Sequence, residues 1–290
     1  MKKPASLAAT AIAIFLMSIH GAAASQDCGK QLTRKIPARN ADAPSGTAVM
    51  QQVMNLGGAE RDAVVAREAL SGNIPSFLRD LTPVSFSGKQ SDGQDIRVTI
   101  CVTPDYLAVG DDIDFVRVPM GLAAAAEIAD RLEFLLPTTK MVDAIYAQAG
   151  VQLAPSPMKP NNKMSSTDYL MRHNQTVEGQ RAGSGRMHTA LTAGQKKDIV
   201  LSNRLRKSPG RVAIYGWHRP NGKPIQPLST VHGALYADYS HGVRLISTTA
   251  YVNGKPKSLT EIIQDPQLSK IVSSEGPIAR AKGLLASLYQ

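Results

Sequence analysis

The order of the hydrophobic periodicities constrains the fold of this chain more than any other feature. Segments with apolar residues at helical spacing, such as 59–71 and 142–149, come before a block of short strand-like runs between about residues 196 and 258. A chain of alternating strand–helix units would interleave the two patterns. The separation favours an α+β fold, with a helical N-terminal half that carries a β-hairpin. A mainly antiparallel C-terminal sheet, closed by helices from Leu259 onward, should follow.

Turn residues divide the strand-like runs into hairpins. Two alternating runs within 84–102 flank a polar loop and are typical of a β-hairpin. Two Asn-Gly pairs, which end at Gly222 and Gly254, follow further strand-like runs. Since primed hairpin turns need positive φ, we expect positive φ at both glycines.

The N-terminus has the pattern of a secretory signal peptide. Lys2 and Lys3 precede an apolar stretch from about residue 7 to 19, and small residues follow up to Ala24. That order of basic, apolar and small residues predicts a signal peptide over 1–24, with cleavage after Ala24. The apolar stretch is shorter than a membrane span requires, and no later stretch is long enough. We therefore expect an exported protein, periplasmic or secreted, without a transmembrane segment in its mature part.

The remaining 25–290 are expected to form a single exported domain, since a chain of this length fits one large core. A stretch rich in Pro, Asn and Ser at 154–167 could mark a subdomain boundary or a surface loop.

The chain has two cysteines, Cys28 and Cys101. Export implies an oxidising compartment, so an even count predicts one disulfide between them. Strict alternation around Cys101 places it on the polar face of its strand, within reach of the N-terminal tail.

The charge balance favours an anionic partner. The chain has 33 Lys and Arg against 23 Asp and Glu, and without Lys2 and Lys3 the net charge is 31 − 23 = +8. These basic residues are dispersed rather than grouped in a run, so nucleic-acid binding is not expected. A dispersed positive field suits an anionic envelope or extracellular polymer. The alternative is that the basic charge serves solubility alone.

The stretch 231–245, VHGALYADYSHGVRL, combines strand-like apolar residues with many groups that can transfer protons or bind anions. With neighbouring positions it supplies the candidate site. The candidate catalytic residues are His218, His232, Asp238 and His241, and the candidate substrate-binding residues are Tyr236, Ser240, Arg244, Trp217 and Lys197.

We expect 231–245 to be a central part of the C-terminal sheet, with its polar residues facing a pocket shared with His218. In one extended strand, however, His232 and Asp238 would lie about 20 Å apart, too far for a common site. A shared site therefore needs a bend, which Gly233 permits.

A zinc hydrolase needs about three protein ligands and one open position. His218, Asp238 and His241 could supply that set, so a divalent metal such as zinc is one candidate cofactor. The set partly resembles the zinc peptidases that cleave peptidoglycan peptides, but Trp217-His218 precedes Asp238 here, so the resemblance gives no residue its role. His173, by contrast, lies on the apolar face of its helix and is interpreted as a core residue.

Two classes of function fit these features. One is an exported hydrolase that acts on a cell-envelope or extracellular polymer through the His/Asp site, with or without a metal. The other is a non-catalytic exported binding protein that holds an anionic ligand or envelope polymer in a basic groove bearing Tyr and Arg.

Overall fold

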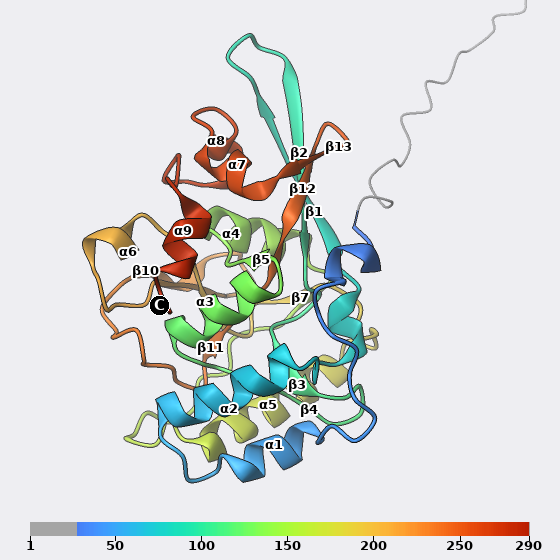
Figure 1. Ribbon diagram of the computed structural model, residues 1–290, viewed down its shortest axis with the longest axis vertical. Coiled ribbons are helices and arrows are strands. Elements are labelled where there is room, and N and C mark those ends of the chain that lie inside the picture. Colours follow the sequence, from blue (N-terminus) through green and yellow to red (C-terminus); the bar gives the residue numbers. More distant parts are fainter. Residues whose placement is uncertain (1–27, 290) are drawn as a thin grey trace, which may run out of the picture.

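The computed structural model describes residues 28–289 (Figure 1). The expected signal peptide over 1–24 lies outside these residues. Between residues 28 and 289, no helix is long and apolar enough to cross a membrane.

The fold is a mixture of helices and mainly antiparallel sheets, which confirms the α+β class. The helices are η1 (Lys30–Thr33), α1 (Gly46–Gln52), α2 (Gly58–Leu70), η2 (Ser76–Arg79), α3 (Leu122–Arg131), α4 (Thr139–Gln148), α5 (Thr167–Ala182), α6 (Arg204–Lys207), α7 (Leu259–Gln264), α8 (Ser269–Val272) and α9 (Ala281–Ala286).

Side-chain caps start several of these helices. The hydroxyl of Thr138 accepts a hydrogen bond from the Met141 amide at the start of α4, and Ser166 does the same for Tyr169 in α5. These caps satisfy amides that the first helical turn leaves without partners. Of the stretch 154–167, residues 154–166 run as a loop between β6 (Val151–Gln152) and α5, and Thr167 begins α5. A subdomain boundary in that loop stays a prediction.

The main sheet joins the two ends of the sequence. Its order is β1 (Thr82–Lys89), β2 (Asp95–Val102), β12 (Ile246–Val252) and β13 (Lys255–Ser258), and β5 (Phe134–Leu135) also pairs with β12. The expected hairpin is present as β1 and β2. Because β2 pairs with β12, the N-terminal hairpin and the C-terminal strands share one core instead of forming separate halves.

A second sheet holds the candidate site. Its order is β10 (Pro224–Ser229), β9 (Ile214–His218), β8 (Lys197–Ile199) and β11 (His241–Gly242), and its last pair is parallel. The remaining strands are β3 (Ala108–Gly110) paired with β4 (Phe115–Arg117), and β6 paired with β7 (Thr192–Ala193).

The expectation of one central strand over 231–245 is wrong. Within this stretch only β11 is a strand, and it lies at the edge of its sheet. The chain before it turns at Gly233, where the Tyr236 amide donates to the Gly233 carbonyl. Ala234 is held on both sides, since its amide donates to the Gly210 carbonyl and its carbonyl accepts from the Leu122 amide. These contacts with other segments outweigh the strand-like composition.

The C-terminal helices do not simply close the C-terminal sheet. Helices α7 and α9 pack together, α7 lies on β12 and β13, α8 contacts β1, and α9 contacts α3. In Figure 1 α7 and α8 lie beside the main sheet, whereas α9 lies next to α3.

The two Asn-Gly pairs form turns of different types. Gly222 has φ 78° and Gly254 has φ 80°, which confirms the expected positive values. Asn253 is also left-handed, at φ 48°, as a type I′ turn requires. Gly222 instead ends a longer loop, in which its amide donates to Arg219 and the Arg219 amide donates to Lys223.

The expected disulfide between Cys28 and Cys101 is present, with 5.4 Å between the two Cα atoms. The expected polar, open face around Cys101 is not: Cys101 is fully buried and Thr99 is nearly so. Cys28 shields Cys101 from solvent because the two are bonded. The Thr99 hydroxyl forms a hydrogen bond with the Ser85 hydroxyl on β1.

Replacing Cys28 by Ser should lower the free energy of unfolding by about 4 kcal/mol, because the disulfide closes a loop of 73 residues. Urea unfolding of wild type and variant under non-reducing conditions measures this. Adding reductant should lower the free energy of unfolding of the wild type to that of the variant and leave the value of the variant unchanged. A wild type insensitive to reductant would contradict the prediction.

Replacing Gly254 by Ala should cost about 1 kcal/mol, because Ala is strained at positive φ although the space around Gly254 is open. Gly150→Ala is the matched control, since Gly150 has equally open space without a positive φ. The control should be neutral or slightly stabilising. Thermal unfolding of both variants tests the pair, and equal losses would contradict the assigned turn.

Candidate functional site

The turn at Gly233 brings together three of the four candidate catalytic residues. The ring centroids of His232 and His241 lie 6.2 Å apart, and Tyr236 stacks on His232 at 4.4 Å. The Tyr236 ring also meets His241 edge-on at 5.7 Å. The bend that an extended strand lacked is therefore present, and it places His232 and Tyr236 beside His241.

Asp238 is a buried carboxylate with a full set of local donors. It accepts hydrogen bonds from the Ser240 amide at 2.8 Å, from the Ser240 hydroxyl, and from the Tyr236 hydroxyl at 3.2 Å. Burial acts to raise the pKa of Asp238, but His241, Lys197 and the bonds from Ser240 outweigh it and hold the pKa below its usual value. Asp238 is therefore ionised at neutral pH.

His241 is fully buried beside this carboxylate. Neither of its ring nitrogens has a hydrogen-bond partner among residues 28–289. Burial lowers the pKa of His241 to about 4, although Asp238 acts to raise it. His241 is thus a neutral imidazole, and its two buried nitrogens cost stability because they have no partners among the described residues.

Lys197 and Trp217 lie next to each other, and Lys197 is on the strand beside His241. Lys197 is the register partner of His241, and its ammonium lies 5.1 Å from the centroid of the Trp217 ring. Trp217 is only 6% exposed, and its indole N–H has no partner within the described chain. Its backbone is left-handed at φ 59°, a strained conformation of a kind that is concentrated at functional sites.

A buried Lys–His pair, which sequence reasoning missed, lies close to Asp238. The Lys196 ammonium is 3.0 Å from Nδ1 of His173 and also donates to the Tyr239 carbonyl. Burial and Arg117 lower the pKa of Lys196 to about 7, against the pull of Asp238. Burial and Lys196 lower the pKa of His173 to about 2. His173 is a core residue, as its helical face indicated, but one that positions a titratable amine.

His218 is placed elsewhere. Its Nε2 lies 2.8 Å from Oδ1 of Asp143, and its ring stacks on Tyr146 of α4 at 4.6 Å. Tyr215 donates to the same carboxylate. The Trp217 ring lies against Lys197, whereas the next residue, His218, faces α4. The backbone between them is left-handed at Trp217.

The expected metal set of His218, Asp238 and His241 is therefore not assembled. Within residues 28–289, no group of three His, Cys, Asp or Glu side chains could hold a metal ion. His218, Asp238 and His241 therefore do not fit a zinc centre.

Arg244 is buried in a structural arrangement. Its two terminal nitrogens donate to the Thr103 and Thr192 carbonyls, and its guanidinium lies 4.2 Å from the centroid of the Tyr106 ring. Tyr106 in turn donates to Asp198, whose pKa burial raises to about 6 against the charge of Arg244. These contacts favour a role for Arg244 in packing β11, not in holding a substrate anion.

Comparisons with known protein families, with curated proteins and with solved structures find no match for this chain. Its function is therefore inferred from the side chains themselves.

Replacing His241 by Leu should leave the free energy of unfolding at pH 7 unchanged or raise it by about 1 kcal/mol, because it removes two buried nitrogens without partners. Asp238→Ala should lower it by more than about 2 kcal/mol, because Ser240 and Tyr236 lose their acceptor. Urea unfolding measures both. A loss for His241→Leu as large as that for Asp238→Ala would contradict the description of His241.

The same variant tests the lowered pKa of His241. Between pH 6.5 and about 4 the unfolded histidine binds a proton that the folded one does not, so the wild type should lose stability as pH falls. His241→Leu should show a shallower loss over that range. Some slope will remain, because His173 has a lowered pKa as well. Identical slopes would show that His241 is not a neutral buried group.

Proposed function

We propose that this protein is an exported hydrolase that acts on a cell-envelope or extracellular polymer through Asp238 and His241. The observation that supports this most is the buried, neutral imidazole of His241, with two ring nitrogens lacking partners, beside an ionised carboxylate. A leucine there would avoid the cost of burying them. Chemistry explains the histidine better than stability does.

In this proposal His241 takes a proton from the attacking water as general base, and Asp238 stabilises the imidazolium that forms. The imidazolium then gives that proton to the leaving group as the attacked bond of the substrate breaks. The bonds from Ser240 and Tyr236 fix the carboxylate in place. The indole N–H of Trp217 carries a partial positive charge, and the neighbouring ammonium of Lys197 carries a full one. They would stabilise negative charge developing on the substrate.

Access to His241 involves the segment 231–237. The half-buried rings of His232 and Tyr236 lie between His241 and the surface, while Val231 and Leu235 are 73% and 64% exposed. Large apolar side chains exposed at the rim of a polar site suit contact with a ligand. We propose that substrate displaces this segment to reach His241.

Export and an anionic polymer are supported by independent features. The disulfide between Cys28 and Cys101 suits an oxidising compartment, in line with the N-terminal sequence pattern. The net charge of +8 expected after cleavage favours association with an anionic neighbour.

The second candidate is a binding protein that performs no chemistry. The rings of His232 and Tyr236 that cover His241 favour this alternative, because they restrict the approach of a polymer. In that case Lys197 and the rim at Val231 and Leu235 would hold the anionic ligand.

Release of dye from labelled peptidoglycan and from a labelled acidic polysaccharide tests the proposal. The mature protein should release dye from at least one of them, and His241→Ala should lower the rate by about a hundred-fold or more. His188→Ala is the matched control, since His188 pairs with Glu178 outside the site, and it should keep the wild-type rate.

Three outcomes would count against the proposal. An unchanged rate for His241→Ala would remove this residue from the mechanism. Binding of the polymers without any release by the wild type would favour the binding protein. Loss of release after chelator treatment, with metal found by elemental analysis of the untreated protein, would contradict the metal-free scheme.

A further inference from the structure

A gap in the main sheet forms a cavity whose lining includes none of the candidate histidines. Strands β5 and β13 pair with the same edge of β12, one after the other: Ser247 pairs with Phe134, and Thr249 pairs with Ser258. Thr248 lies between the two partners. Its amide donates to the Glu133 carbonyl at 3.2 Å instead of to a strand.

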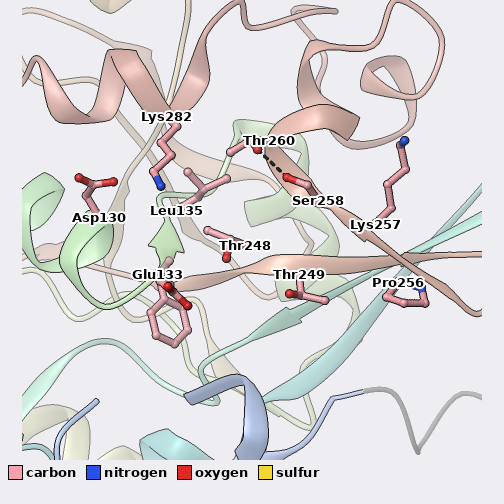
Figure 2. A pocket seen from close by; sticks show the side chains of 11 residues that line it. Asp130, Glu133, Leu135, Thr248, Thr249, Pro256, Lys257, Ser258, Thr260 and Lys282 are labelled. Atoms are coloured by element: carbon pink, nitrogen blue, oxygen red, sulfur yellow. Dashed lines mark hydrogen bonds between the residues drawn. The ribbon is translucent and has the colours of Figure 1, made fainter. Parts of the chain in front are cut away.

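The cavity at this gap has a volume of about 460 Å³ and lies between α3, α7 and α9 (Figure 2). A smaller cavity of about 190 Å³ adjoins it and reaches the segment after η1. The two share Glu133, Thr248 and Thr249, so they adjoin each other along β12, and we call the pair the β12 groove.

The β12 groove carries more positive than negative side chains. Its basic residues are Arg34, Lys35, Lys257 and Lys282, and its acidic residues are Asp130 and Glu133, which gives 4 − 2 = +2. Charges of both signs already have partners: the Tyr289 hydroxyl donates to Asp130 at 2.7 Å, and Lys35 lies 3.5 Å from Glu133. Lys257 lies 3.2 Å from Glu261. An anionic ligand would therefore be held mainly by Lys282. Figure 2 shows the ammonium of Lys282 turned into the cavity.

Hydroxyl groups make up most of the remaining polar lining. They belong to Ser247, Thr248 and Thr249 on β12, to Ser258 at the end of β13, and to Thr260 in α7. Hydroxyls both donate and accept hydrogen bonds, so the groove suits a ligand that is itself rich in hydroxyl groups.

Glu133, which lines both cavities, is held in an unfavourable conformation. Its φ is 63°, in the left-handed region that glycine and asparagine adopt at lower cost. Glu133 comes just after the C-cap residue of α3, and its amide donates to the Asp130 carbonyl, so the left-handed residue ends the helix. The turn leaves the Glu133 carboxylate 3.5 Å from Lys35 in the lining of the groove.

We propose that the β12 groove binds an acidic oligosaccharide, with the ammonium of Lys282 facing its carboxylates and the hydroxyls and Glu133 facing its hydroxyl groups. A single-stranded nucleic acid would need exposed aromatic rings for stacking, and Phe134, the aromatic residue in the lining, is 1% exposed. A peptide strand would need a free sheet edge, and β5 and β13 already occupy that of β12. The inference does not depend on the proposed hydrolase.

Titration calorimetry of the mature protein at low salt, with oligogalacturonate as the probe and a neutral dextran oligosaccharide for comparison, tests this site. Oligogalacturonate should bind and the dextran should bind more weakly. The dissociation constant for oligogalacturonate should rise stepwise from wild type to Lys282→Gln to Lys282→Glu, by about ten-fold overall. Lys223→Glu is the matched control, because Lys223 is equally exposed but lies in the loop between β9 and β10, and it should show a smaller change.

His241→Ala should bind oligogalacturonate like the wild type, so failure of the hydrolase proposal leaves this test intact. The inference is overturned if Lys282→Glu binds no more weakly than Lys223→Glu, or if the neutral dextran binds as tightly as the acidic probe. Tighter binding of an oligothymidylate than of oligogalacturonate would overturn it as well. Melting curves of the variants confirm that each is folded.

Discussion

The pairing of β2 with β12 is the contact on which the rest of the molecule depends. It joins residues about 150 positions apart and fixes the main sheet. One end of β2 carries Cys101, to which Cys28 is bonded, and Thr103 just beyond β2 accepts from the guanidinium of Arg244. The chain that leaves β11 enters β12 directly, so the position of His241 is set by the same register. An N-terminal hairpin thereby supports a site built from C-terminal residues.

The candidate site illustrates how burial changes ordinary side chains. Asp238 stays ionised because Lys197 and the hydrogen bonds from Ser240 favour the carboxylate, whereas His241 stays neutral because its ring is removed from water. At neutral pH both groups are therefore in their basic forms, so His241 can accept a proton beside a carboxylate that stabilises the resulting imidazolium. Lys196, with a pKa of about 7, extends the set of groups that can change charge near neutral pH.

Features that depend on local sequence were predictable, and those that depend on tertiary contacts were not. Positive φ at Gly222 and Gly254 follows from turn chemistry, and the disulfide follows from a count of two. The loop over 231–240 was read as a strand because its hydrogen bonds with Leu122 and Gly210 leave no local signal. The contact of Lys196 with His173 has none either, since it joins a helix and a strand start that only the fold brings together.

The disulfide between Cys28 and Cys101 also affects one end of the β12 groove. Cys28 anchors the segment that continues through η1 to Arg34 and Lys35, which line one end of the β12 groove. In chains whose two thiols are still free, this anchor is absent. The segment with Arg34 and Lys35 would then be held at that end of the groove without a covalent bond to the sheet. Oxidation of Cys28 and Cys101 would then complete the surface at the same moment as it locks the fold.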